Sequence, residues 1–74
     1  MQSSVTLTLN GESRVFDGPG GQPLSVAGLL VALNLDMRKV AVERNEEIVA
    51  RSRYAETWLT SGDRLEIVHF IGGG

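Results

Sequence analysis

Apolar and polar residues alternate near the start of the chain, where Val5, Leu7 and Leu9 are separated by threonines. A period of two is typical of a strand with one buried face. Asn10-Gly11 follows, and this pair favours a type I′ hairpin turn because both residues tolerate a positive φ. We therefore expect a hairpin whose second strand is Glu12–Phe16.

The apolar spacing becomes helical between Leu24 and Leu35. Ser25 is a favourable N-cap, and the apolar residues that follow recur three or four positions apart, on one helix face. Asn34 suits the left-handed position that ends many helices, after which Leu35 can pack back on Leu30. The pattern predicts an amphipathic helix over Leu24–Leu35 that covers one face of a sheet.

Further strands are expected after the helix, at Lys39–Arg44, Glu47–Ala50 and Arg64–Ile71. Turns are expected at Asn45-Glu46 and 61–63, and glycine and proline predict a loop over 17–23. Residues 52–60 follow no regular period, apart from one possible helical turn around residues 54–56. This order predicts an α+β fold, in which a mixed sheet of four to five strands packs on one helix.

Three consecutive glycines, Gly72-Gly73-Gly74, follow the last predicted strand. Glycine has no Cβ, so such a segment can enter a slot too narrow for any other residue. Three extended residues span about 10 Å. We expect residues 1–71 to form the folded domain and residues 72–74 to form a flexible tail.

The last predicted strand is apolar on both faces, which leaves two interpretations open. If Leu65 and Ile67 point into the core, Val68 and Phe70 face outward beside the tail and form a docking patch for a partner. Alternatively, Val68 and Phe70 pack beneath the 52–60 segment, which carries Trp58 and Leu59.

The composition excludes several classes of function. The chain has no cysteine and one histidine, so disulfides, zinc-thiolate sites and cysteine nucleophiles are ruled out and a structural metal site is not expected. The net charge is -2, which argues against nucleic-acid binding. No secretory signal or membrane-spanning run is readable, so we expect a cytoplasmic protein with no membrane partner.

No enzyme active site can be assembled from the motifs. Gly18-Pro19-Gly20-Gly21 lacks the Lys-Ser or Lys-Thr of a P-loop and most simply lets the chain turn. His69 has no serine or cysteine partner in a recognisable motif, so it is expected to be structural or solvated. The terminal carboxylate is the remaining candidate, because an ATP-using partner can convert a carboxylate to an acyl-adenylate that accepts sulfur or an amine.

The chain resembles the thiamine-pathway sulfur carrier proteins, the ThiS-like branch of the ubiquitin-like β-grasp superfamily. The resemblance rests on the first strand with Asn10-Gly11, the helix Leu24–Leu35, the segment Val40–Asn45 and, above all, Ser61–Gly74. It implies a β-grasp fold in which the first and last strands lie side by side, parallel, at the centre of the sheet.

The resemblance also implies a reaction route. An E1-like adenylyltransferase would use ATP and magnesium to activate Gly74, and a cysteine desulfurase would ultimately supply sulfur for a thiocarboxylate there. Thiazole synthase would then receive the sulfur. The chain itself would be a carrier and not an enzyme, with no bound cofactor or metal. The expected partner-binding residues are Val68, Phe70, Ile71, Gly72 and Gly73.

Two alternatives remain open from the sequence. The small subunit of molybdopterin synthase has a similar size and the same Gly-Gly ending, with a different pathway and different partners. A β-grasp adaptor or RNA-binding module with a passive tail is the second alternative, which the acidic pI near 5.2 disfavours where the ligand is RNA.

Overall fold

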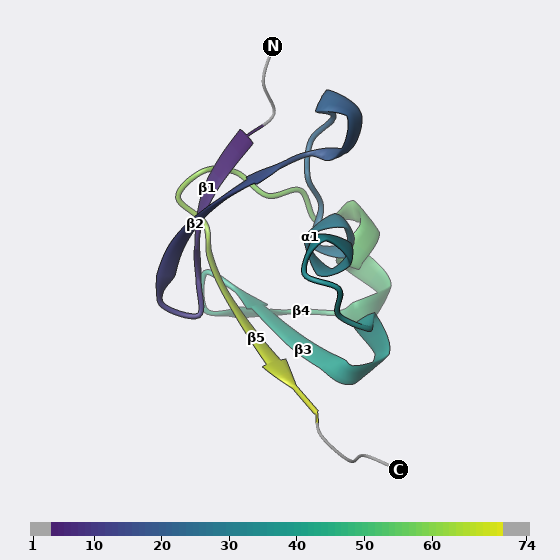
Figure 1. Cartoon of the computed structure of the whole chain (residues 1–74). Coiled ribbons are helices and arrows are strands. Elements are labelled where there is room, and N and C mark those ends of the chain that lie inside the picture. The colour runs from purple at the N-terminus through teal and green to yellow at the C-terminus, as the bar shows by residue number, and fades with distance from the viewer. Residues whose placement is uncertain (1–3, 71–74) are drawn as a thin grey trace.

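A five-stranded mixed sheet is the framework of the protein, for which a computed structural model describes residues 4–70 (Figure 1). Its strands are β1 (Ser4–Leu9), β2 (Glu12–Asp17), β3 (Val40–Arg44), β4 (Glu47–Val49) and β5 (Arg64–His69). The order across the sheet is β2-β1-β5-β3-β4. Strand β5 is parallel to β1 and antiparallel to β3, so the last strand lies in the middle, as the β-grasp expectation requires.

Helix α1 (Val26–Ala32) packs against one face of this sheet and has seven residues. The predicted span Leu24–Leu35 was too long at both ends. Ser25 is confirmed as the N-cap, because its Oγ accepts a hydrogen bond from the Gly28 amide at 3.0 Å. The residues just outside the helix continue its apolar spacing because they also face the core, and for this reason the pattern overstated the helix.

The C-terminus of α1 is a Schellman motif. Asn34 adopts a φ of 60°, and its amide donates to the Val31 carbonyl at 3.0 Å. The Leu35 amide donates to the Leu30 carbonyl at 2.9 Å, which returns the chain onto the helix as expected. The left-handed residue stops the helix while satisfying carbonyls that would otherwise lack partners.

The hairpin turns also follow the sequence. Asn10 and Gly11 have φ values of 49° and 86°, and Asn45 and Glu46 have values of 52° and 72°. Positive φ at both central residues defines the type I′ turn, whose twist matches that of the flanking strands. The turn between β1 and β2 is therefore confirmed in type, and the turn at Asn45-Glu46 is confirmed in place.

Short 3-10 helices occupy some residues that were predicted to be strand or loop, and one of them confirms the helical turn expected around residues 54–56. They are η1 (Pro19–Gly21), η2 (Met37–Lys39) and η3 (Arg51–Glu56). Because η2 includes Lys39, strand β3 begins one residue later than expected, at Val40. Strands β4 and β5 likewise end earlier than expected, at Val49 and His69, and Ile71 lies outside the described residues.

The glycine-rich segment between β2 and α1 lets the main chain change direction. A Cβ on Gly18 would lie 1.5 Å from the Gln22 carbonyl oxygen, so no larger residue fits. Gly20 and Gly21 have φ values of 59° and 79°, which glycine adopts without strain. These observations support the interpretation that this segment turns the chain.

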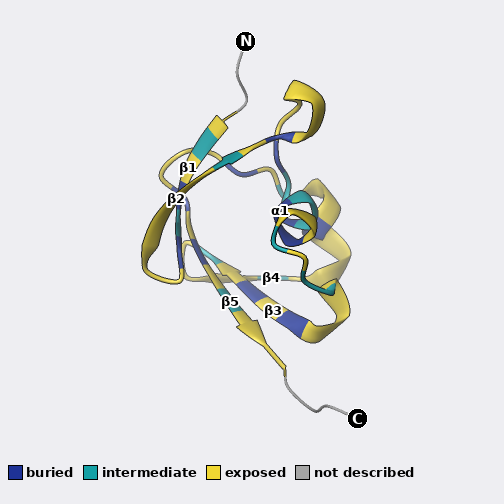
Figure 2. Ribbon diagram, viewed as in Figure 1, coloured by how far each residue is buried: buried dark blue, intermediate teal, exposed yellow. Residues whose placement is uncertain are grey.

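The core lies between α1, η3 and the sheet face that they cover (Figure 2). Its buried residues are Leu7, Leu9, Leu24, Val26, Leu29, Leu30, Val40, Val42, Tyr54, Leu59 and Leu65. Segment 57–59 is tied to the beginning of α1, because the Val26 amide donates to the Thr57 carbonyl and the Leu59 amide donates to the Leu24 carbonyl. The irregular 52–60 region therefore completes the helix side of the molecule.

The predicted boundary between a domain at 1–71 and a tail at 72–74 lies outside the described residues. Among residues 4–70, no helix is both long and apolar enough to cross a membrane.

Candidate docking face at the end of β5

Strand β5 places alternate side chains on opposite faces of the sheet. Leu65 is buried beneath α1, and Ile67 is partly buried on the same face. Val68 and Phe70 lie on the other face and are 59% and 48% exposed. The outward interpretation of these two residues is therefore confirmed. The interpretation that placed them beneath the 52–60 segment is wrong, because that segment packs on the helix side.

The face opposite α1 carries a small apolar surface beside the exit of β5. Ala41 on β3 is the register partner of Val68, and Phe70 follows two positions along the same face. We call Ala41, Val68 and Phe70 the docking patch. The Phe70 amide donates to the Lys39 carbonyl at 2.7 Å, so the main chain stays beside β3 after β5 ends.

Two acidic side chains border the docking patch. Glu43 and Glu66 are direct register partners on β3 and β5, one alternation from Ala41 and Val68. Like charges directly opposite in a sheet are destabilising. Glu43 and Glu66 line a small surface hollow together with Glu46 and Arg64. The side chains of Glu46 and Arg64 form an exposed ion pair at 3.4 Å.

The sequence did not reveal this acidic pair. Glu43 and Glu66 lie far apart along the chain, and only the antiparallel register of β3 and β5 brings them together. The available signal was that each acid sits at an outward position of its predicted strand. A confident pairing register would have been needed to use that signal.

His69 is exposed at the end of β5, on the face that α1 covers. It borders a surface hollow of about 330 Å³ lined by Leu9, Asn10, Arg14, Leu33, Leu35, Ile67 and His69. This open placement agrees with the expectation of a solvated histidine. Within residues 4–70 no group of three histidine, aspartate or glutamate side chains gathers to hold a metal ion.

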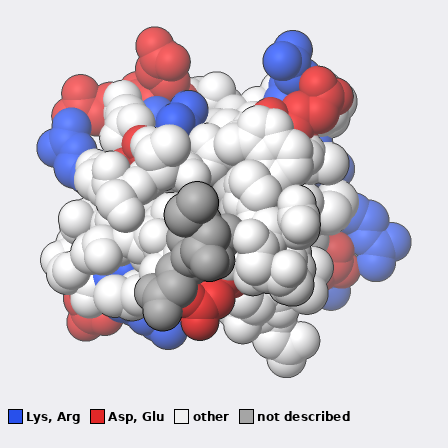
Figure 3. Space-filling model, turned by 90° about the horizontal axis from the view of Figure 1, so that it is seen from above, with Lys and Arg blue, Asp and Glu red and all other residues white. Residues whose placement is uncertain are grey.

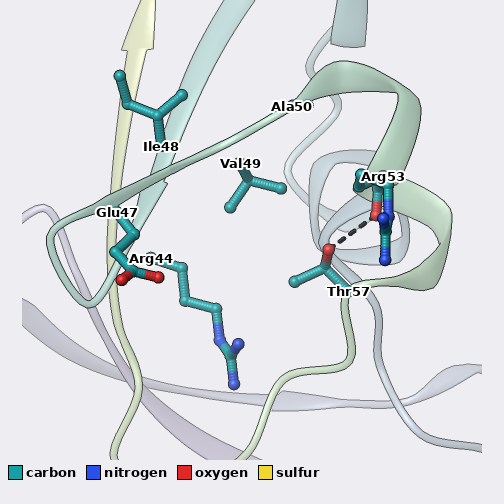
Figure 4. Close-up of a pocket in the computed structure, with 7 residues that line it drawn as sticks. All are labelled: Arg44, Glu47, Ile48, Val49, Ala50, Arg53 and Thr57. Carbon is teal, nitrogen blue, oxygen red and sulfur yellow. Dashed lines mark hydrogen bonds between the residues drawn. The ribbon is translucent and has the colours of Figure 1, made fainter.

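A larger hollow of about 440 Å³ lies between β4 and η3 (Figure 4). Arg44 and Arg53 project toward it, yet both cations have anionic partners. Arg44 Nε lies 3.0 Å from Asp63 Oδ2, and Arg53 Nε lies 3.9 Å from Glu56 Oε1. Since both cations are already paired, the hollow is a poor anion site.

Charge is mixed on the face of the molecule that is seen from above (Figure 3). On the face shown in Figure 3, basic and acidic side chains alternate around the periphery, and the visible centre is mostly uncharged. Among the described residues, this face shows no basic stripe of the kind that typically accompanies nucleic-acid binding (Figure 3).

Comparison with known proteins decides the family. The ThiS family model matches residues 7–74, which includes nearly the whole chain. The chain belongs to the ThiS family. The expected resemblance to thiamine-pathway sulfur carriers is thereby confirmed.

The ThiS relatives include whole carriers and longer proteins. The chain is 41% identical over 68 residues to the sulfur carrier protein ThiS of Bacillus subtilis, covering 92% of this chain and 98% of that one. It is 53% identical over 70 residues to a thiazole synthase of Paramagnetospirillum magneticum, covering 95% of this chain and 20% of that protein. The chain thus spans about a fifth of the length of this thiazole synthase and of one from Magnetococcus marinus.

Solved structures of a ThiS protein confirm the fold. A crystal structure of the thiamine biosynthesis protein ThiS from Geobacter metallireducens matches with a TM-score of 0.71 and 35% identity, covering 95% of this chain and 100% of that one. A solution structure of the thiamine biosynthesis protein from the same organism gives a TM-score of 0.76 and 37% identity, covering 95% and 88% of the two chains. The sheet and helix described above are those of a ubiquitin-like ThiS fold.

The remaining predicted site residues are not part of the described structure. Ile71, Gly72, Gly73 and Gly74 lie outside residues 4–70, so their roles stay predictions. All four lie within the segment that the ThiS family model matches.

Proposed function

We propose that the protein is a sulfur carrier of thiamine biosynthesis that is charged at the carboxylate of Gly74. The observation that carries this proposal is the ThiS family match, which extends through Gly74. The exposed docking patch supports it, because two of its residues, Val68 on β5 and Phe70 just after it, shortly precede the glycine run in the sequence. In this role the chain is a co-substrate on which partner enzymes act.

The chemistry follows from the carboxylate. An α-carboxyl group has a pKa of about 3.3–3.7, so it is ionised at neutral pH and is a poor acyl donor. An E1-like adenylyltransferase with ATP and magnesium would let a carboxylate oxygen attack the α-phosphorus, releasing pyrophosphate. The outer sulfur of a persulfide formed by a cysteine desulfurase would then attack the carbonyl carbon, and AMP would leave with the original oxygen. A thiol reductant would cleave the resulting acyl disulfide by thiol–disulfide exchange, and the product would be a thiocarboxylate.

The acceptor partner in this proposal is thiazole synthase. The support is that proteins named thiazole synthase contain a region similar to this chain within a longer polypeptide. Two activities joined in one polypeptide commonly act in succession. We infer that the separate carrier and a thiazole synthase act together here.

The docking patch and the acidic pair would serve recognition. Val68 and Phe70 offer apolar area beside the exit of β5, and Glu43 with Glu66 adds two negative charges next to it. A partner with an apolar surface rimmed by cations would complement both features. Such charge complementarity mainly accelerates association.

Intact mass spectrometry tests the proposal directly. The protein is incubated with a ThiS-adenylating enzyme, ATP, magnesium, a cysteine desulfurase, cysteine and a thiol reductant. We expect the mass increase produced by replacing one oxygen with sulfur, located at Gly74 by fragmentation. An unchanged mass under conditions that charge the Bacillus subtilis carrier would refute the proposal.

Two controls separate the alternatives. A variant without Gly73 and Gly74 should retain the fold and lose all charging, whereas an adaptor with a passive tail would keep its function. Binding to thiazole synthase in preference to the large subunit of molybdopterin synthase would distinguish the two pathways, and the ThiS family match favours thiamine.

A further inference from the structure

Strand β5 is flanked by two hairpins that turn in the same way. The β1–β2 turn begins with Asn10, and the β3–β4 turn begins with Asn45, with φ values of 49° and 52°. Both main-chain amides donate to β5, from Asn10 to the Leu65 carbonyl at 2.9 Å and from Asn45 to the Arg64 carbonyl at 2.8 Å. The two asparagines are therefore structural counterparts on opposite sides of the central strand.

Asn45 holds the beginning of β5. Its Oδ1 accepts a hydrogen bond from the Arg64 amide at 2.9 Å, and its Nδ2 donates to Asp63 Oδ1 at 3.1 Å. These contacts lie at the end of β5 that is farthest from the glycine run.

Asn10 binds β5 farther along, at Ile67. Its Oδ1 accepts a hydrogen bond from the Ile67 amide at 2.9 Å, and its Nδ2 donates to the Ile67 carbonyl at 3.4 Å. The β1–β5 ladder ends at the pair Leu9–Leu65, because the chain turns away at Asn10. The Asn10 carboxamide therefore occupies the place that the next residue of a longer β1 would take.

This contact lies directly before the docking patch. Beyond Ile67, β5 continues to pair with β3, through Ala41–Val68 and the hydrogen bond from Phe70 to Lys39. Val68 and Phe70 are 59% and 48% exposed, so packing contributes little to holding this end in place. The hydrogen bond from the Ile67 amide to Asn10 Oδ1 restrains β5 from the β1 side, just before Val68.

We propose that Asn10 is a positioning residue whose carboxamide fixes β5 at Ile67, so that the docking patch is presented to the adenylating partner in one orientation. The inference rests on the proposed carrier function. A segment that is ordered before binding loses less conformational entropy on association, so its restraint improves binding without touching the reacting atoms. The role therefore concerns the KM of the carrier as a substrate and leaves kcat unchanged.

The matched variants are Asn10→Gly, Asn10→Asp and Asn45→Gly. Glycine adopts positive φ without strain, so both glycine variants keep their turns and lose only the side-chain bonds. Asn10→Asp keeps the acceptor for the Ile67 amide and loses the donor. Asn45→Gly removes an equivalent clamp at the other end of β5 and serves as the control for general destabilisation.

Two measurements are made on each full-length variant: amide hydrogen exchange at Ile67 and Val68, and the steady-state kinetics of charging by the adenylating system. For Asn10→Gly we expect exchange at Ile67 to accelerate by about tenfold, as for the loss of one or two hydrogen bonds. Its KM should rise several-fold with kcat unchanged. Asn10→Asp should show smaller increases in the Ile67 exchange rate and in KM than Asn10→Gly. Asn45→Gly should lower the melting temperature and leave KM unchanged.

Each other result counts against the inference. Unchanged Ile67 exchange in Asn10→Gly would show that the carboxamide does not restrain β5. Faster exchange with an unchanged KM would show that the restraint does not affect presentation, and an equal rise of KM in Asn45→Gly would assign the effect to stability. Failure of the wild-type protein to be charged would refute the carrier function itself, and with it the positioning role.

Discussion

Arg44 donates its Nε–H to Asp63 Oδ2 over 3.0 Å, joining the end of β3 to the residue that precedes β5. Asp63 is 6% exposed, and its carboxylate also accepts hydrogen bonds from the Thr60 amide at 2.9 Å and from Asn45 Nδ2 at 3.1 Å. Burial raises the pKa of Asp63, but the hydrogen bonds from Thr60, Asn45 and Arg44 together outweigh it and hold the pKa below its usual value. The entry into the central strand thus depends on an ionised, well-coordinated carboxylate.

The protein should lose stability in acid through Asp63. A carboxyl group whose pKa is lower in the folded state contributes stability above its unfolded pKa of about 3.9, and this contribution is lost as the pH falls through the folded pKa. The free energy of unfolding from urea titrations should therefore decrease below about pH 4. In Asp63→Asn this part of the pH dependence should be absent, and an unchanged profile in that variant would contradict the assignment.

Replacing Asp63 with asparagine should also lower stability at neutral pH. The amide keeps the shape of the carboxylate but leaves donors from Arg44, Asn45 or Thr60 without an acceptor, at a cost of about 1–3 kcal/mol. The exposed Asp17→Asn variant, in which the hydrogen bond to the Ser4 hydroxyl lies at the surface, is the control and should change stability by less. Equal effects of the two substitutions would contradict the special role of Asp63.

Phe70→Ala should weaken partner binding more than it weakens the fold. Because the Phe70 side chain is 48% exposed, its truncation should lower the free energy of unfolding by less than about 1 kcal/mol. The affinity of the Phe70→Ala protein for the adenylating enzyme, measured by calorimetry, should fall by more than about tenfold, because the aromatic ring is expected to anchor the interface. Val31→Ala, at an exposed position on α1, should change neither quantity, and a loss of several kcal/mol in Phe70→Ala would place the ring in the core.

Replacing Gly73 with leucine should block charging and leave folding intact. A bulky side chain at this position would obstruct entry of the glycine run into a narrow partner site, while residues 4–70 supply the core. Circular dichroism should show an unchanged melting temperature, and mass spectrometry should show no thiocarboxylate. Gly73→Ala, with a smaller side chain, should retain part of the activity. Unfolding of the leucine variant would mean that Gly73 packs against the body.

Glu66→Gln should slow association while leaving the fold at least as stable. The substitution removes one charge of the Glu43–Glu66 pair, which relieves a repulsion of about 0.2–1 kcal/mol. The association rate with the adenylating enzyme, measured by stopped flow, should fall and should depend less on salt. Glu12→Gln, at an exposed position on β2, is the control, and equal effects would indicate a response to net charge alone.

Local sequence signals predicted most of the fold. The alternation of Val5, Leu7 and Leu9, the Asn10-Gly11 turn and the Ser25 cap act over a few residues, so the pattern reports them directly. The errors lie at element ends, such as the helix that was extended to Leu35. There, residues that pack on the core without helical geometry carry the same apolar spacing as helical residues.

The candidate site was predictable only in part. The alternation in β5 left Val68 and Phe70 with two placements, and the packing of the 57–59 segment on α1 decides between them. The hydrogen bond between Ile67 and Asn10 joins residues 57 positions apart. Patterns among neighbouring residues therefore predict the role of Asn10 in its turn, but not its contact with β5. Contacts of this range depend on the register of the whole sheet, which no short segment specifies.

The central place of β5 has a consequence for the protein during its synthesis. A ribosome that has completed only β1 to β4 has made two hairpins whose shared neighbour does not yet exist, since β1 and β3 meet through β5. Such a nascent chain cannot close its core, because Leu65 arrives with the missing strand. We therefore expect an interrupted product to stay unfolded and open to proteolysis, and every copy that folds carries the strand that bears Val68.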